Sequence, residues 1–426
     1  MPTPSACLSC REPAVEEFLD LGTVPLANAL LDAPPARAAA EPRHPLRVGY
    51  CHRCHAVQLL DLVPPEQLFT DYVYESSFSD AFLLHARHYA DELTRRLRLG
   101  PDSFVVEIAS NDGYLLKNFV QARVPCLGVE PAQNIAAKAC ARGVPTMARF
   151  FDQATSALIR RERGQASVVI GNNVLAHVPA IVPFLTAVKD LLQPEGVAVF
   201  EFPWLRELVR HLEFDTIYHE HAYYLSLHAL RSAAALAGLE LLDSKEQRVH
   251  GGSLRVFLQA RREVAAPRSP TAEVARLLEL ERQDGLDRPD VYRALGRRVR
   301  ALRESLRVLL GALKQQGKRI VAYGASAKGS TLLNYCGIGS ETLDYIVDRS
   351  TVKQGRYAPG VHLPIFGVDR LLQDKPDYAL LLAWNFADEI RRQQRAYEQQ
   401  GGRFIHPVPE PRVLGEAAAA AHEQSA

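Results

Sequence analysis

Apolar runs alternate with amphipathic stretches through the middle of the chain. Short apolar runs predict buried strands, and the stretches between them have the spacing of helices. The predicted strands are 104–109, 125–129, 144–147, 167–171, 196–202, 238–243 and 254–260. The predicted helices are 113–123, 132–142, 152–163, 179–192, 204–212 and 228–237. This alternation predicts an α/β domain with a doubly wound, mostly parallel sheet.

A shorter series of the same kind follows near the C-terminus. It has predicted strands at 318–323, 343–347 and 378–383 and a helix at 331–335. An imperfect glycine loop, 324–330, follows the first of these strands, so we expect a second Rossmann-like unit. Lys328 in this loop suits a phosphate at a helix N-terminus. A degenerate duplicated domain that only packs is the alternative.

The first central strand ends in a turn suited to a cofactor. A Gly-x-Gly-x-x-Gly loop would admit a diphosphate, but Ala109 and Asn111 stand where its first two glycines would be. Glu107 would repel a diphosphate and attract a cation, which favours S-adenosylmethionine. Glu130, about twenty residues on, can accept hydrogen bonds from both ribose hydroxyls. The expected cofactor-binding residues are Glu107, Ala109, Asn111, Asp112, Gly113, Glu130, Asn172 and Asn173.

Composition limits the remaining classes of protein. With 426 residues, of which 47% are hydrophobic, the chain is long enough for two or three domains. A net charge of +1 gives no reason to expect a nucleic-acid or membrane partner. No apolar run approaches the ~20 residues of a membrane span. The first residues lack the features of a signal peptide, so we expect a cytoplasmic protein.

Four of the seven cysteines form two Cys-x-x-Cys pairs, Cys7 with Cys10 and Cys51 with Cys54. Two such knuckles complete a closed tetrahedral site, so we expect a structural zinc ion. His52 or His55 is an alternative ligand. A redox dithiol would need only one pair, so the second pair argues against it.

Together these patterns predict a zinc-binding domain at 1–70, a cofactor domain at 71–262, a helical connector at 263–316, a second Rossmann-like domain at 317–415 and a disordered tail at 416–426.

Two stretches carry candidate acid–base chemistry. Tyr218, His219, Glu220 and His221 are consecutive, and imidazole titrates near neutral pH. A metal site lacks a clear third ligand here, and a polar surface loop is a further alternative. Asn172, Asn173 and His177 follow a predicted strand and should line the pocket beyond its carboxyl end.

Two further stretches carry candidate substrate contacts. Residues 71–79 are rich in tyrosine and hydroxyl groups, and we expect either a flap over the site or a helix-capping turn with packed tyrosines. The glycines that follow His250 allow close approach to a ligand or simply form a hairpin or bulge.

Seven motifs in this order resemble the sugar C-methyltransferases of antibiotic deoxysugar biosynthesis. They are the paired Cys-x-x-Cys, Tyr-x-Tyr-x-Ser-Ser, Glu-x-x-x-Asn-Asp-Gly, Asn-Val-Leu-Ala-His-Val, Tyr-His-Glu-His-x-x-Tyr, His-Gly-Gly-Ser and Gly-Ala-Ser-Ala-Lys-Gly. The resemblance covers nearly the whole chain, although Ala109 replaces an expected glycine. It implies a zinc domain, a central class I S-adenosylmethionine methyltransferase domain and a C-terminal Rossmann-like domain.

The resemblance also implies a reaction and its residues. The substrate would be a nucleotide-linked 4-keto deoxysugar, carrying dTDP, that is methylated beside the ketone at C3. The implied catalytic residues are His221, Glu220, Tyr218, His177 and one of Tyr72 and Tyr74. The expected substrate-binding residues are Ser76, Ser77, His250, Gly251, Ser326 and Lys328. Two alternatives are an O- or N-methyltransferase and a non-catalytic zinc protein that binds a nucleotide or nucleic acid. The oligomeric state stays open.

Overall fold

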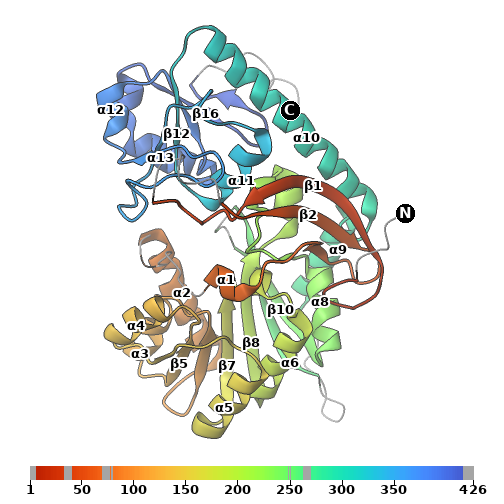
Figure 1. Ribbon diagram of the computed structural model, residues 1–426. Coiled ribbons are helices and arrows are strands. Elements are labelled where there is room, and N and C mark those ends of the chain that lie inside the picture. The colour runs from red at the N-terminus through yellow and green to blue at the C-terminus, as the bar shows by residue number, and fades with distance from the viewer. Residues whose placement is uncertain are drawn as a thin grey trace, which may run out of the picture. The chain divides into compact units, whose positions relative to one another are not determined.

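The computed structural model describes residues 6–32, 41–69, 77, 80–247, 249, 251–261 and 270–415, which form two compact units (Figure 1). The first unit holds the chain up to Phe18, Val48–Arg206 and Glu220–Tyr292. The second holds Leu19–Arg47, Glu207–His219 and the chain from Arg293. The chain therefore passes between the two units several times, which a reading of consecutive segments does not predict.

A seven-stranded sheet organises the first unit, in the order β10-β11-β8-β7-β4-β5-β6. Its strands are β4 (Val105–Ile108), β5 (Cys126–Val129), β6 (Thr146–Met147), β7 (Ala166–Asn172), β8 (Leu192–Pro203), β10 (Leu239–Gln247) and β11 (Ser253–Ala260). Neighbours from β6 to β8 are parallel, whereas β11 is antiparallel to both β8 and β10. The predicted α/β fold is confirmed. The order reverses between β4 and β7, where ligands bind in open sheets of this kind.

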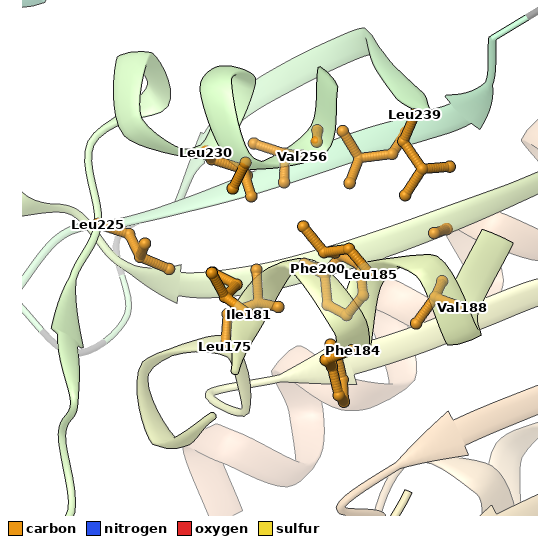
Figure 2. Packing of buried hydrophobic residues seen from close by; sticks show 14 of the residues in the cluster. Leu175, Ile181, Phe184, Leu185, Val188, Phe200, Leu225, Leu230, Leu239 and Val256 are labelled. Atoms are coloured by element: carbon orange, nitrogen blue, oxygen red, sulfur yellow. The ribbon is translucent and has the colours of Figure 1, made fainter. Parts of the chain in front are cut away.

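Helices cover both faces of this sheet. They are α2 (Asp80–Leu97), α3 (Leu116–Gln121), α4 (Gln133–Ala141), α5 (Gln153–Arg163), α6 (Ile181–Leu191), α8 (Leu227–Leu236) and α9 (Ala272–Gln283), whereas α7 (Leu205–His211) begins in the first unit and belongs mostly to the second. One core packs α5, α6 and α8 against the sheet, and Figure 2 shows Phe184, Leu185 and Leu230 near Phe200 and Val256. The other core packs α2 and α3 on the opposite face through Tyr89, Leu93 and Phe119. Apolar residues on both faces explain the continuous apolar runs of the strands.

A smaller sheet has the order β1-β2-β3-β9. Its strands are β1 (Val15–Pro25), β2 (Arg43–Cys51), β3 (Val57–Leu59) and β9 (Tyr223–Tyr224), and the short α1 (Pro65–Phe69) follows β3. Antiparallel pairing joins β3 to β2 at one edge and to β9 at the other. The cysteine-bearing turns are thereby tied to the segment that follows His221.

The second unit contains a six-stranded sheet in the order β14-β13-β12-β15-β16-β17, which is the 3-2-1-4-5-6 order of a Rossmann fold. Its strands are β12 (Ile320–Tyr323), β13 (Ile346–Val347), β14 (Ile365–Phe366), β15 (Tyr378–Leu381), β16 (Arg403–His406) and β17 (Arg412–Val413). Its helices are α10 (Pro289–Gln315, which begins in the first unit), α11 (Ala327–Cys336), α12 (Arg370–Asp374), α13 (Ala387–Gln393) and α14 (Arg395–Gln399).

Helix α11 begins four residues before the predicted position. The Ser326 hydroxyl accepts a hydrogen bond from the Gly329 N–H and caps the helix at this point. A capping serine satisfies a donor that the first turn leaves without an intrahelical partner. Lys328 therefore lies in the first turn of α11 and not in the loop before it.

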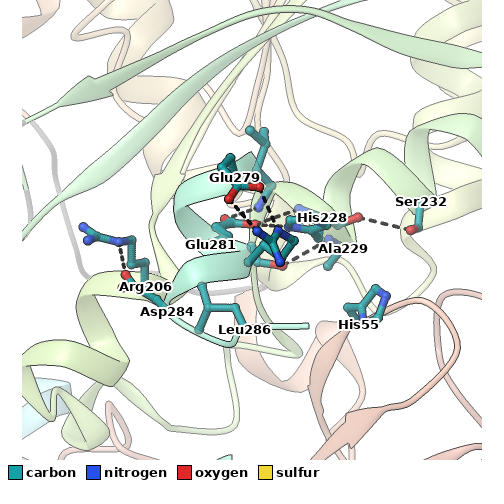
Figure 3. Close-up of polar contacts among 12 residues, drawn as sticks. His55, Arg206, His228, Ala229, Ser232, Glu279, Glu281, Asp284 and Leu286 are labelled. Carbon is teal, nitrogen blue, oxygen red and sulfur yellow. Dashed lines mark hydrogen bonds and ion pairs between the residues drawn. The ribbon is translucent and has the colours of Figure 1, made fainter. Parts of the chain in front are cut away.

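One buried carboxylate connects α9 to the start of α8 (Figure 3). Glu281 Oε1 accepts hydrogen bonds from Trp204 Nε1 and the Leu227 N–H, each at 2.6 Å. Its Oε2 accepts from the His228 N–H at 3.0 Å and from His228 Nδ1 at 2.7 Å. All four donors therefore point at one fully buried acid, at a helix N-terminus that favours negative charge.

Replacing Glu281 with Gln is expected to lower the free energy of unfolding by about 3–5 kcal/mol, because the amide turns an N–H₂ group toward N–H donors. Glu279→Gln is the matched control, since this nearby acid is exposed and pairs with Arg282 and Gln283 at the surface (Figure 3). Thermal melting of both variants checks this. Equal melting temperatures would contradict the role of Glu281.

Candidate active site

The four paired cysteines converge on one point. Their sulfur atoms all lie within 4.8 Å of one another, with Cys7 to Cys54 at 3.5 Å and Cys10 to Cys51 at 3.7 Å. Tetrahedral zinc with bonds of ~2.3 Å to sulfur requires sulfur–sulfur distances of ~3.8 Å. The thiol set therefore fits a zinc ion that is closed to substrate.

Local backbone geometry produces the two cysteine knuckles. The N–H of Arg11 donates to the Cys7 carbonyl, and the N–H of His55 donates to the Cys51 carbonyl. Arg11 and His55 both have positive φ, which turns the chain back after each pair. His55 Nδ1 hydrogen-bonds the Tyr50 hydroxyl and His52 pairs with Glu16, so both histidines serve other contacts.

The turn after β4 has an unusual backbone. Ala109, Asn111 and Gly113 have φ of 54°, 50° and 79°, three left-handed residues in alternation. A left-handed alanine costs about 1–2 kcal/mol, which explains why a glycine would be expected at position 109. These left-handed residues also delay the helix, so α3 begins later than predicted. Gly128 is required opposite the turn, because a Cβ there would lie 2.4 Å from Ser110 Oγ.

Glu130 at the end of β5 holds this turn. Its two carboxylate oxygens accept hydrogen bonds from the N–H groups of Asn111 and Ala132, both at 2.9 Å. Burial raises the pKa of Glu130, and the two backbone donors oppose that shift. Each oxygen keeps a second lone pair, so the carboxylate can still accept hydrogen bonds from ribose hydroxyls.

Glu107 is a buried carboxyl group at the carboxyl end of β4. It is fully buried, and neither oxygen has a hydrogen bond to any residue that the structure describes. Burial, followed by the charges of Glu130 and Asp112, raises the pKa of Glu107 well above its usual range. A buried acid without a donor is costly, and a cationic ligand would relieve that cost. This observation fits the sulfonium and ammonium groups of S-adenosylmethionine.

Arg142 contacts both Asp112 and Ser77. Arg142 Nη1 lies 2.5 Å from Asp112 Oδ2 and 3.3 Å from Ser77 Oγ. Ser77, the one described residue of the stretch 71–77, therefore lies beside the turn after β4. Tyr72, Tyr74, Ser76 and His250 fall outside the described residues. Gly251 is exposed in the turn between β10 and β11, where the Gly252 N–H donates to the Val249 carbonyl.

Strand β7, the neighbour of β4, contributes further polar groups at the carboxyl edge of the sheet. The Asn172 side-chain amide donates to the Tyr114 hydroxyl at 3.2 Å, so the buried Tyr114 is a neighbour of Asn172 that the sequence did not indicate. Asn173 has φ of 53°, and its N–H donates to the Glu201 carbonyl at 2.7 Å. The bond from Asn173 to Glu201 joins the carboxyl ends of β7 and β8.

His177 and His221 come together beside this edge. Their ring centroids are 4.8 Å apart, and the Tyr224 ring centroid lies 6.3 Å from that of His221. His177 Nδ1 donates to the Glu220 carbonyl at 2.7 Å, and burial lowers the pKa of His177 to about 4. His177 is therefore neutral at pH 7, with the Nε2 lone pair as an acceptor. Two histidines 44 residues apart thus form one cluster.

Tyr218 and His219 belong to the second unit. His219 Nε2 donates to the Pro45 carbonyl at 3.1 Å, within that unit. Lys328 lies with its Nζ 4.8 Å from the centre of the Trp384 ring, and Trp384 Nε1 donates to the buried Asp215. The sequence does not predict that Trp384 and Asp215 lie beside Lys328, although Trp384 follows β15 at the carboxyl edge of its sheet.

Three family models match consecutive parts of the chain: "Putative zinc binding domain" at residues 7–69, "Methyltransferase domain" at 82–244 and "C-methyltransferase C-terminal domain" at 248–409. C-methyltransferase NovU of Streptomyces niveus is 37% identical over 408 residues, which cover 95% of this chain and 96% of NovU. The chain belongs to this zinc-containing C-methyltransferase family.

Solved structures resemble the chain only in part. A methyltransferase of Clostridium acetobutylicum, described as S-adenosylmethionine-dependent, is 12% identical over 44% of this chain and 94% of its own, with a TM-score of 0.35. Magnesium protoporphyrin IX methyltransferase of Synechocystis is 15% identical over 42% of this chain and 83% of its own, with a TM-score of 0.34. Scores this low add nothing to the family assignment.

The family assignment confirms the enzyme class. The C-methyltransferase uses S-adenosylmethionine and carries a structural zinc site, as the cysteine pairs and the turn after β4 predict. Across the described residues, no helix combines the length and apolar composition that a membrane span requires.

The affinity of this C-methyltransferase for S-adenosylhomocysteine should rise with pH. Burial raises the pKa of Glu107, and a cationic amine binds its ionised form, so binding releases a proton at every pH at which the free acid is protonated. The gain is at most about tenfold per pH unit below the pKa of Glu107, and it ends above that pKa. Calorimetry across neutral pH measures this. Glu107→Gln should bind more weakly with a flatter pH dependence, and an unchanged slope would exclude Glu107.

Proposed function

We propose that the chain methylates a nucleotide-linked 4-keto deoxysugar, carrying dTDP, at C3 beside the ketone. One observation carries this proposal: His177, Glu220 and His221 gather at the same edge of the methyltransferase sheet as Asn172. A carbon beside a ketone loses a proton to a base when the enolate is stabilised, and a histidine cluster suits that step. The likeness to NovU supports a role in antibiotic biosynthesis.

His221 acts as the base in this proposal, and Glu220 orients it. The carbon–hydrogen bond of the substrate breaks, its electron pair delocalises into the enolate, and the proton moves to His221. Hydrogen bonds to the enolate oxygen come from Tyr218 and from Tyr72 or Tyr74. His177 accepts a hydrogen bond at Nε2, since its Nδ1 hydrogen is given to the Glu220 carbonyl. Bound S-adenosylmethionine supplies an electrophilic methyl group.

In this proposal each cofactor-binding residue contacts a different part of S-adenosylmethionine. Glu107 faces the cationic part, Glu130 accepts from the ribose, and the turn formed by Ala109, Asn111, Asp112 and Gly113 places backbone N–H groups nearby. Asn172 and Asn173 close the pocket at the end of β7. The unpartnered carboxyl of Glu107 supports this arrangement.

Ser326 and Lys328 bind the nucleotide part of the substrate in this proposal. The Trp384 ring, held by its hydrogen bond to Asp215, supports the Lys328 ammonium at the start of α11. A lysine at a helix N-terminus suits a diphosphate. Ser76, Ser77, His250 and Gly251 contribute further contacts to the sugar. The domain boundaries predicted from the sequence and a cytoplasmic location, where thiolates stay reduced, belong to the same proposal.

Solvent exchange tests the proposal directly. Incubation of the enzyme with a dTDP-linked 4-keto deoxysugar in D₂O, without S-adenosylmethionine, should introduce deuterium beside the ketone. Addition of the cofactor should then add one methyl group at that carbon, which mass spectrometry and NMR detect. Methyl transfer to oxygen or nitrogen without carbon exchange would replace this proposal with the O- or N-methyltransferase alternative.

A further inference from the structure

Strand β9 begins two residues after His221 and lies at the edge of the smaller sheet. It is only two residues long, and in the described part of the chain it pairs with β3 alone. The Leu59 N–H extends this pairing, since it donates to the Ala222 carbonyl at 2.9 Å. Because so short an edge strand has few ladder bonds, side-chain contacts contribute much of its attachment.

Strand β3 holds one side of β9. It begins three residues after Cys54, the last ligand of the second cysteine knuckle. Its middle residue, Gln58, lies opposite Tyr223 and is 1% exposed. Gln58 Oε1 accepts a hydrogen bond from the Leu8 N–H at 2.9 Å, within the first knuckle. Both cysteine knuckles are therefore joined to the strand that pairs with β9.

The Tyr223 hydroxyl reaches the loop that carries His177. The Tyr223 side chain is buried in the same hydrophobic core as Cys54. Its hydroxyl donates to the Pro179 carbonyl at 3.2 Å. Pro179 lies two residues after His177, and β9 also packs against the short turn η3 (Leu175–His177). Tyr223 therefore connects β9 to the loop after β7, within the first unit.

Two hydrogen bonds join these segments on either side of His221. On the residue before His221, the Glu220 carbonyl accepts from His177 Nδ1 at 2.7 Å. Two residues after His221, the Tyr223 hydroxyl donates to Pro179. Two points of attachment fix both the position and the direction of one segment relative to the other. They thereby set the 4.8 Å separation between the His177 and His221 ring centroids.

A buried tyrosine hydroxyl needs an acceptor in any fold, so structural support alone is the alternative. Tyr397 in the second unit is a tyrosine of that kind. It is 1% exposed, packs against Phe404 and donates to the Pro376 carbonyl at 3.1 Å. Tyr223 differs from it because each of the two segments that it joins carries a histidine of the proposed catalytic site.

We propose that Tyr223 is a positioning residue for methyl transfer, because its hydroxyl holds the His221 segment against the loop of His177. This inference rests on the proposed function, from which it takes the two histidines as catalytic residues. A displacement of about 1 Å in a catalytic group can cost a hundredfold in rate. Loss of the hydroxyl should therefore slow proton abstraction without weakening the binding of the cofactor.

Tyr223→Phe removes the hydroxyl and keeps the ring, so the core around Cys54 stays filled. Its turnover number should fall roughly five- to hundredfold, and deuterium exchange at the substrate carbon should fall in parallel. Affinity for S-adenosylhomocysteine, measured by calorimetry, should stay unchanged. Tyr397→Phe loses an equivalent bond to a proline carbonyl and is the matched control. Both variants should melt at similarly lowered temperatures, but Tyr397→Phe should keep the original turnover and exchange.

Backbone amide exchange, followed by mass spectrometry, reports the attachment without any substrate. The His177 N–H donates to the Val174 carbonyl at 2.9 Å, so its exchange measures local opening of this loop. In Tyr223→Phe the peptide that covers 174–179 should exchange about two- to tenfold faster, as expected for one lost hydrogen bond. In Tyr397→Phe its exchange should not change.

Faster local exchange together with slower turnover would support the positioning role. Unchanged local exchange in Tyr223→Phe would overturn it, whichever substrate the enzyme methylates. Faster local exchange with the original turnover would overturn it too, since the position of the loop would then not limit the rate. Failure of the proposed function is a separate result, in which the unmodified enzyme exchanges no hydrogen at the substrate carbon.

Discussion

His221→Asn should lower the turnover number by about a hundredfold to ten-thousandfold, the usual contribution of a general base. Asparagine keeps a polar group near the His177 ring but cannot take a proton. Affinity for S-adenosylhomocysteine should change little, because the described hydrogen bonds that hold Glu130 and Asn172 run to Asn111, Ala132 and Tyr114 and not to His221. Steady-state kinetics and calorimetry on the same preparation measure the two effects.

His211→Asn provides the matched control. His211 is an exposed histidine that pairs with Glu207 at the surface, so its replacement should leave turnover unchanged. Deuterium exchange at the substrate carbon should be lost in His221→Asn and kept in His211→Asn. An active His221→Asn enzyme that still exchanges this hydrogen would assign proton abstraction to another group.

Loss of the zinc ion should have the largest effect on stability. Structural zinc contributes about 10–16 kcal/mol in small zinc domains, comparable with the whole stability of a typical domain. Cys10→Ser removes one of four ligands, and we expect loss of zinc and a melting temperature at least several degrees lower. The zinc content of the purified protein and its thermal melting measure both consequences.

Cys140→Ser tests whether this effect belongs to the zinc site. Cys140 is an exposed cysteine on α4 and lies outside the four-cysteine group. This variant should keep one zinc ion per chain and the original melting temperature. Stoichiometric zinc and unchanged melting in Cys10→Ser would contradict the structural role.

Glu107 shows which features of the candidate site can be predicted from the sequence and which cannot. Its place at the end of an apolar run predicts a carboxylate at the carboxyl edge of the sheet, where a cation would bind. That no described residue donates a hydrogen bond to Glu107 is not visible in the sequence, because this depends on every neighbour that packs around it. The same holds for Ala109, whose positive φ is imposed by the turn and not by alanine itself.

The neighbours of the buried histidines are far away in the sequence, so the motifs do not predict them. The motifs single out His177 and His221, but only the fold shows their rings 4.8 Å apart. His85 carries no motif, and its partners Glu201 and Arg255 are 116 and 170 residues away. Side-chain chemistry is local, whereas the pairing of buried charges is decided by strand register.

The sequence by itself determined the α/β class, the paired zinc ligands and the strand that contains Glu107, because these depend on short spacings and on periodic burial. Tertiary structure alone decided that the chain passes repeatedly between two units, that Trp384 supports Lys328 and that Glu201 contacts His85. Periodicity specifies which face of an element is buried. It does not specify which other element covers that face, since many partners bury similar apolar area.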